Sequence, residues 1–214
     1  MVLGKIPRRR TWLIGLGLAN AFLIGAAAGI FYSRPPSCSD VPCERFVMRG
    51  WAIENAIRQG DGTPRYLAIG DSITEGALLP EICGRRPINA GIIGATVKTF
   101  EKLGPRLAAM AQPDFIILAL GTNDALHSVS GFPEKLAALI ASLKQWPVIV
   151  VPLPPGEDVN DVATFNAAIA ALAVPKAKPL ERVETTDGIH LTTADYAAWK
   201  ASIVAAASAA VCPR

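Results

Sequence analysis

The stretch YLAIGDSITEG, residues 66–76, begins with four apolar residues and then changes to glycine, a carboxylate and a hydroxyl group. A short apolar run that ends at glycine is typical of a buried strand. Beyond it, short apolar runs alternate with longer amphipathic stretches, the pattern of an α/β protein whose parallel strands are covered on both faces. The stretch therefore predicts the first strand of a parallel sheet, with a polar cluster at its carboxyl end.

The same reading along the chain predicts one doubly wound sheet of five strands. The expected strands are 66–69, 87–90, 115–120, 147–153 and 180–183, and the expected helices are 44–59, 97–111, 133–146, 159–173 and 194–211. In such a sheet the ligand lies at the carboxyl ends of the strands. Functional residues are therefore expected at the carboxyl ends of the predicted strands.

Three polar clusters follow predicted strands, at residues 70–72, 121–124 and 187–190. If the sheet is parallel, the clusters meet at one edge although they are far apart in sequence. A serine becomes a useful nucleophile only when a base takes its proton, and the base needs an acid to orient it. Ser72, His190 and Asp187 supply these three groups, so we expect a Ser-His-Asp catalytic triad.

The oxyanion of an acyl-transfer reaction also needs hydrogen-bond donors. We assign this role to the backbone N–H of Ser72, the backbone N–H of Gly94 and the side-chain amide of Asn123. Glycine at position 94 would let the backbone approach a reacting ester, because no Cβ stands in the way.

Together these residues resemble the SGNH (GDSL-type) hydrolases, a family of serine esterases and lipases. Residues 70–76 (GDSITEG) resemble the family's first block, Gly94 its second, residues 121–124 (GTND) its third and residues 187–192 (DGIHLT) its last. The resemblance spans about residues 65–200. It implies a flavodoxin-like three-layer α/β/α sandwich, the triad and oxyanion donors named above, and no metal or other cofactor. One departure, Asp195 before Tyr196 where the family often has glycine before an aromatic residue, puts the start of the last helix in doubt.

Four other polar residues are expected to have structural roles. Asp71 is expected to cap a helix rather than to act as an acid. Glu75 is interpreted as structural, and His127 as part of a surface loop. Asn166, in an otherwise apolar helix, is expected to form hydrogen bonds in the core or in a groove.

Residues 1–33 are expected to form a transmembrane anchor or a signal peptide. The 21 residues from Trp12 to Tyr32 carry no charge and would extend about 31 Å as a helix, enough to cross a bilayer. Basic residues just before them favour a cytoplasmic N-terminus and an exported C-terminal part. A cleaved signal peptide remains the alternative, because residues 26–28 (AAA) fit a cleavage site. The catalytic domain would then be either anchored on the periplasmic or extracytoplasmic side of the inner membrane or secreted.

Residues 34–60 are interpreted as a linker and leading helix, and residues 61–214 as the hydrolase domain. All four cysteines follow the apolar segment, as expected for disulfides in an oxidising compartment. Free buried thiols are the alternative, and sequence leaves three possible pairings open. The cysteines are Cys38, Cys43, Cys83 and Cys212.

Charge argues against a nucleic-acid partner. The chain has a net charge of +3, but five of its 21 basic residues precede residue 35, which leaves 16 basic against 18 acidic residues in the remainder. A nucleic-acid binder needs a basic patch on its folded face.

The sequence predicts an exported serine esterase acting on short acyl esters, acetyl esters foremost, of carbohydrate or cell-envelope substrates. Two alternatives stay open. One is a lysophospholipase or thioesterase of the same fold, and the other is a non-catalytic module that binds glycans. The sequence does not indicate an oligomeric state.

Overall fold

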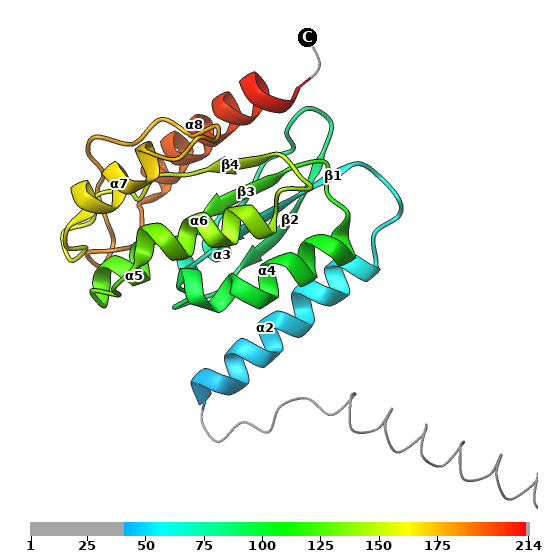
Figure 1. Cartoon of the computed structure of the whole chain (residues 1–214), viewed down its shortest axis with the longest axis horizontal. Coiled ribbons are helices and arrows are strands. Elements are labelled where there is room, and N and C mark those ends of the chain that lie inside the picture. The colour runs from blue at the N-terminus through cyan, green and yellow to red at the C-terminus, as the bar shows by residue number, and fades with distance from the viewer. Residues whose placement is uncertain (1–40, 213–214) are drawn as a thin grey trace, which may run out of the picture. The chain divides into compact units, whose positions relative to one another are not determined.

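The computed structural model describes residues 41–212, and its centre is a parallel four-stranded sheet in the order β2-β1-β3-β4 (Figure 1). The strands are β1 (Arg65–Gly70), β2 (Arg86–Gly91), β3 (Ile116–Ala119) and β4 (Val148–Val150). The register pairs Gly70 with Gly91 and with Ala119, so the first three strands end level with one another. The segments that follow them therefore begin at one edge of the sheet.

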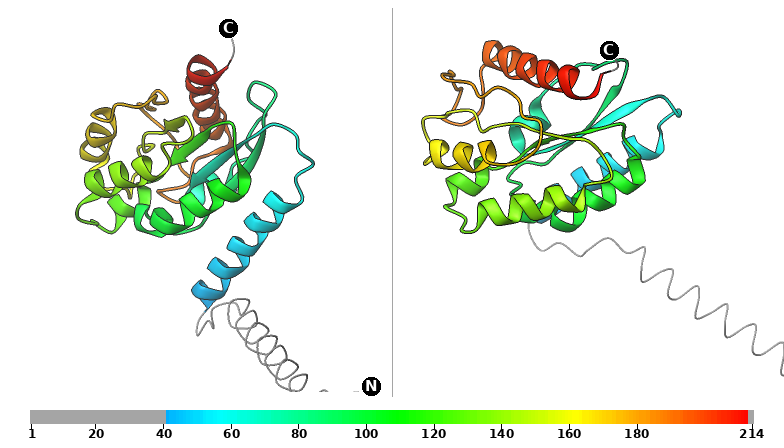
Figure 2. Two further views of the ribbon diagram at one scale, coloured as in Figure 1. Left: turned by 45° about the vertical axis from the view of Figure 1, so that its right-hand side comes forward. Right: turned by 45° about the horizontal axis from the view of Figure 1, so that its top comes forward.

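Helices cover both faces of this sheet, as Figure 2 shows from two further directions. They are α2 (Val41–Arg58), α3 (Ser72–Gly76), α4 (Val97–Ala111), α5 (Thr122–Leu126), α6 (Phe132–Ser142), α7 (Val162–Ala170) and α8 (Thr193–Val211). Alternate strand residues point to opposite faces, as the pleat requires. Leu67 and Ile69 pack in one apolar core with residues of α4, α6 and α7, while Tyr66 and Ala68 pack in the other with Trp199 of α8.

Residues Met48–Arg214 form one compact unit, so the later turns of α2 belong with the sheet. Ile53 and Ile57 from these turns are buried in the same core as α4. Helices α6, α7 and α8 begin and end within a few residues of the sequence predictions, and α4 matches its predicted range of 97–111. The short helices α3 and α5 were not among the predicted ranges.

The prediction of a fifth strand at residues 180–183 is wrong, because this segment forms no strand. On the outer side of β4, residues 41–212 form only a single parallel bridge, between Val150 and Lys176. The bridge lies between Pro175 and Pro179, and proline has no N–H with which to extend a ladder. Apolar residues at 180 and 183 instead pack, partly buried, against the core on the α8 side.

The predicted membrane segment at residues 1–33 lies outside the described residues. Within residues 41–212, no helix is both long and apolar enough to cross a membrane.

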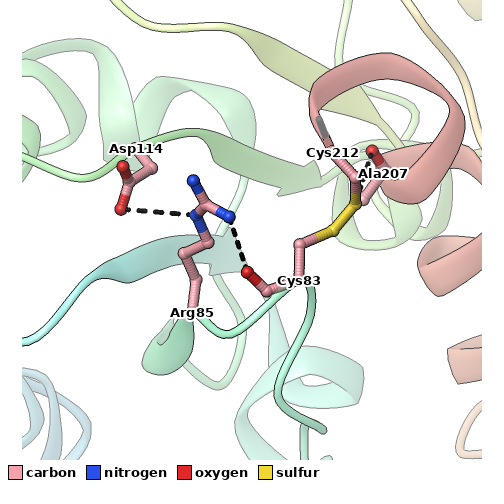
Figure 3. Close-up of a disulfide and its surroundings, with 5 residues drawn as sticks. All are labelled: Cys83, Arg85, Asp114, Ala207 and Cys212. Atoms are coloured by element: carbon pink, nitrogen blue, oxygen red, sulfur yellow. Dashed lines mark hydrogen bonds and ion pairs between the residues drawn. A yellow bond between two sulfur atoms is a disulfide. The ribbon is translucent and has the colours of Figure 1, made fainter. Parts of the chain in front are cut away.

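A disulfide joins the loop before β2 to the end of α8, through Cys83 and Cys212 (Figure 3). The Cα atoms are 5.8 Å apart and the two residues are separated by 129 positions. Arg85 donates a hydrogen bond to the carbonyl of Cys83 and lies 3.8 Å from Asp114. The prediction of disulfides is thus confirmed for this pair, and none of the described cysteines is free.

We expect the double variant Cys83→Ser/Cys212→Ser to lose about 2–4 kcal/mol of unfolding free energy, because a cross-link over so long a loop restricts the unfolded chain. Urea unfolding of the oxidised wild type and the variant measures the loss. An unchanged midpoint would contradict a stabilising role.

Candidate active site

Ser72 stands at the carboxyl end of β1, where the chain turns directly into α3. Asp71 is the N-cap of this short helix, and its Oδ1 accepts a hydrogen bond from the N–H of Ile73 at 3.0 Å. The tight turn requires glycine before it, because a Cβ on Gly70 would lie 2.5 Å from Cβ of Thr74 in α3. The prediction that Asp71 caps a helix is confirmed.

Asp187 holds His190 at two points in the loop before α8. Its Oδ1 accepts the backbone N–H groups of His190 at 2.8 Å and Ile189 at 3.2 Å. Its Oδ2 lies 2.7 Å from Nδ1 of the His190 ring. The carboxylate therefore fixes both the loop and the imidazole that the loop carries.

These contacts also keep Asp187 ionised. Hydrogen bonds from the His190 backbone and from its ring lower the pKa of Asp187 to about 2. A carboxylate can accept but not donate, so Nδ1 of His190 must carry the proton of their hydrogen bond. This leaves the lone pair on Nε2.

The lone pair of Nε2 faces the nucleophile candidate, since Nε2 lies 2.9 Å from Ser72 Oγ. The structure thus brings together the three residues that the sequence suggested, although Ser72 and His190 are 118 positions apart. The order hydroxyl, imidazole, carboxylate is the arrangement in which a serine hydroxyl can be deprotonated as it attacks.

The other two predicted residues, Gly94 and Asn123, are linked through the loop after β2. The N–H of Ile92 donates to the carbonyl of Gly70 at 3.0 Å, which ties this loop to the end of β1. Asn123 Nδ2 donates to the carbonyl of Ala95 at 3.0 Å, so one amide hydrogen orients the side chain and the second remains available.

Gly94 is exposed, and its φ of +74° is a conformation that favours glycine. Within the described residues, the backbone N–H groups of Ser72 and Gly94 donate to no other protein group. Two unused backbone donors and one oriented amide are the parts from which an oxyanion hole is built.

Asp71 also lies in an unusual environment, which the sequence did not suggest. Asp71 is buried, and burial raises its pKa to about 6. Hydrogen bonds from the N–H of Ile73 and from the Thr122 hydroxyl lower the pKa, but their effect is smaller than that of burial. Beneath Asp71 a cavity of about 10 Å³, bordered by Thr122 and Trp199, is just large enough for one water molecule.

Asp124 connects the third cluster to α4. Its side chain is fully buried, Oδ2 accepts the N–H of Val97 at 3.1 Å, and burial raises its pKa. The GTND motif contained this residue, but nothing in the motif separated it from the neighbouring Asn123 as a structural link.

Helix α8 begins at Thr193, one residue before the predicted start, because Thr192 and Asp195 cap it. Asp195 Oδ2 accepts the Thr192 hydroxyl at 2.6 Å and the N–H of Glu184 at 3.1 Å. Tyr196, one residue later, donates its hydroxyl to the carbonyl of Ile73 at 3.1 Å. The departure from the family pattern thus leaves the start of the helix in place.

The remaining sequence interpretations have clear positions in the structure. The amide of Asn166 pairs with both backbone groups of Leu153 at 2.8 and 3.0 Å, which confirms the expected hydrogen bonds. His127 is exposed at the end of α5. Among the described residues, no three His, Cys, Asp or Glu side chains are grouped as metal ligands.

Comparison with known proteins identifies the class of this protein. Residues 68–198 match the GDSL-like Lipase/Acylhydrolase family, and the chain belongs to this family of carboxylic ester hydrolases. No curated protein matches the chain in sequence.

Several solved structures share the fold. A GDSL-like lipase from Bacteroides thetaiotaomicron is similar at a TM-score of 0.59 and 21% identity, over 75% of this chain and 96% of that one. The lipase/acylhydrolase from Enterococcus faecalis is similar at 0.56 and 21%, over 70% and 98%. An acetyl xylan esterase from Geobacillus stearothermophilus is similar at 0.52 and 16%, over 71% and 95%.

The raised pKa of Asp71 predicts how stability depends on pH. Because its folded-state pKa of about 6 exceeds the ordinary value near 4, the folded state favours the proton and stability falls as pH rises from about 4 to about 6. Asp71→Asn keeps an acceptor for Ile73 and cannot ionise, so it should remove this slope.

At pH 8 we expect Asp71→Asn to be more stable than the wild type by about 3 kcal/mol. Urea unfolding of both proteins at pH 4.5 and pH 8 measures the difference. A variant that shows the same pH slope as the wild type would contradict the role of Asp71.

Proposed function

We propose that the chain is an exported serine esterase that hydrolyses short-chain acyl esters, acetyl esters foremost, on carbohydrate or cell-envelope substrates. The observation that carries the proposal is the hydrogen-bonded series Ser72–His190–Asp187, with contacts of 2.9 and 2.7 Å. Membership in the acylhydrolase family agrees with it.

In the first step Ser72 Oγ attacks the ester carbonyl and His190 Nε2 takes its proton. Asp187, ionised and bonded to Nδ1, stabilises the imidazolium that forms. The N–H groups of Ser72 and Gly94 and the free amide hydrogen of Asn123 stabilise the oxyanion. When the carbon–oxygen bond breaks, His190 gives its proton to the departing alcohol and an acyl-Ser72 ester remains.

In the second step water attacks this ester while His190 takes one of its protons. The second tetrahedral intermediate uses the same donors, the bond to Oγ breaks, and His190 returns the proton to Ser72. The carboxylic acid leaves and the enzyme returns to its starting state. Each step needs only side chains and backbone groups that lie at this edge of the sheet.

The tight packing of the residues next to Ser72 supports a preference for short acyl groups. Ile73 and Trp199 are each 2% exposed, and the cavity that they border with Asp71 has a volume of only about 10 Å³. This cavity, lined by residues next to the nucleophile in sequence, has no room for an acyl chain. The acetyl xylan esterase that shares the fold illustrates that such a scaffold serves acetyl esters of carbohydrate.

The proposed export, with the chain either anchored in the inner membrane or released from it, rests on the sequence of residues 1–33 and on the disulfide. The uncharged run from Trp12 to Tyr32 follows a basic cluster, which favours export of the later residues. The Cys83–Cys212 disulfide is stable in an oxidising compartment and is unusual in the cytosol.

A second candidate function, hydrolysis of a lipid ester or thioester, is favoured by two exposed apolar residues. Leu78 is 87% exposed just after α3, and Ile93 is 66% exposed in the loop that carries Gly94. A long acyl chain could lie on such a surface instead of entering a pocket. Chain-length dependence separates the two candidates.

Replacing Ser72 by Ala should lower kcat for p-nitrophenyl acetate by about 10³-fold or more, because the nucleophile is lost. The control is Ser130→Ala, which removes an exposed hydroxyl of the loop before α6 and should keep full activity. Circular dichroism checks that both variants are folded. Activity of Ser72→Ala close to that of the wild type would refute the mechanism.

A series of p-nitrophenyl esters from acetyl to dodecanoyl should give its highest kcat/KM at acetyl, because the cavity beside Asp71, of about 10 Å³, is too small for a longer acyl chain. A maximum at octanoyl or longer would instead support the lipid hydrolase.

A further inference from the structure

The loop that presents Gly94 has little apolar packing at its tip. Ile93 is 66% exposed, and a Cβ built on Gly94 would meet no atom within 4 Å. An oxyanion donor is useful only when it is held in position before the reaction, since small displacements of a catalytic group cost large factors in rate. Ile92 and Ala95 on either side are buried in the core, so it is the tip, Ile93 and Gly94, that depends on polar contacts.

One such contact comes from Glu75 at the end of α3. Its Oε2 accepts the backbone N–H of Ile93 at 2.7 Å. Because Ile93 directly precedes Gly94, this bond restricts the backbone that orients the Gly94 N–H. It also connects the oxyanion loop to the helix that begins with Ser72.

The position of Glu75 is in turn controlled by Arg49 of α2. Nε of Arg49 lies 3.5 Å from Glu75 Oε1 and donates to the carbonyl of Gly91 at 2.7 Å. Nη2 of Arg49 donates to the carbonyl and the side chain of Asn89 at 3.0 and 3.1 Å. A single guanidinium therefore contacts the end of β2, the start of the loop and Glu75.

Asn89 completes the connection to α3. Its Nδ2 donates to the carbonyl of Thr74 at 2.7 Å, and its Oδ1 accepts the N–H of Gly91 at 2.9 Å. The Arg49 and Glu75 side chains are 25% and 26% exposed, which shields their attraction from much of the solvent. The whole arrangement joins α2, α3 and β2 at the base of one loop.

We propose that Glu75, held by Arg49, is a positioning residue that fixes the Gly94 N–H in the oxyanion hole. The inference rests on the proposed function, because it assigns Glu75 a role in the same reaction. Glu75 touches no reacting atom. It acts through the backbone of Ile93, so its removal should weaken stabilisation of the transition state and leave binding of the ground-state ester almost unchanged.

The test compares Glu75→Ala and Glu75→Gln with the wild type in the full-length chain. Glu75→Ala loses both contacts and should lower kcat for p-nitrophenyl acetate about 10- to 100-fold, with KM changed less than about threefold. Glu75→Gln keeps an oxygen for the N–H of Ile93 and should recover most of the rate. The control is Glu101→Ala, which removes an exposed carboxylate of α4 and should change neither constant.

Two further readouts distinguish positioning from general damage. Titration with a fluorophosphonate counts competent sites, and kcat is expressed per titrated site. A trifluoromethyl ketone, whose adduct places an oxyanion in the hole, should bind Glu75→Ala more weakly by about the factor lost in kcat/KM. If Glu75→Ala does not fold, Arg49→Met, which leaves the carboxylate in place but unsupported, should show a smaller loss with the same pattern.

A Glu75→Ala enzyme with wild-type kcat per site, or with unchanged ketone affinity, would overturn the inference. So would a loss confined to KM. This failure is distinct from failure of the proposed function, in which Ser72→Ala itself would retain activity.

Discussion

The close approach of α3 to the ends of β1 and β2 is the constraint on which the site depends. A Cβ on Gly91 would lie 2.7 Å from Glu75 Cα, and one on Gly70 would lie 2.5 Å from Thr74 Cβ. Only glycine at these two paired positions lets the helix sit against the sheet edge. Ser72 then lies at the same edge of the sheet as the loops that follow β2 and β3. The reactivity that we propose for Ser72 therefore depends on where the fold places its hydroxyl group.

Burial divides the carboxylates of this edge into two kinds. Asp71 and Asp124 are buried, their pKa values are raised, and each accepts a backbone N–H at the start of a helix. Asp187 is exposed and its pKa is lowered by hydrogen bonds from His190. The first two therefore connect elements, whereas the third remains charged over the whole range in which the protein is expected to work. Hydrogen bonding, not burial, maintains the charge that the imidazolium needs.

Much of this arrangement could be predicted from sequence, since strand ends in a parallel sheet share one edge and the motifs were local. The position of Ser72 at the end of β1 follows from that rule. Asp187 and His190 were expected there because they follow the predicted fifth strand, but that strand does not form, and the loop before α8 brings them to Ser72 instead. The fifth strand could not be predicted, because the apolar residues at 180 and 183 contribute to a core without pairing and the prolines at 175 and 179 limit the ladder. The role of Arg49 could not be predicted from the sequence either. Its partners Gly91 and Asn89 lie about forty positions away, and no local pattern marks a side chain that acts on a distant loop.

The central claim is that Ser72 is an activated nucleophile, and the intact mass of the protein after exposure to a fluorophosphonate tests it most directly. Attack by Oγ forms a bond to phosphorus and expels fluoride, a reaction that ordinary serine hydroxyls do not undergo at a useful rate. The account predicts one adduct on the wild type and none on Ser72→Ala, with both proteins folded. A folded wild type that gains no adduct, or a Ser72→Ala variant that gains the same one, would contradict it.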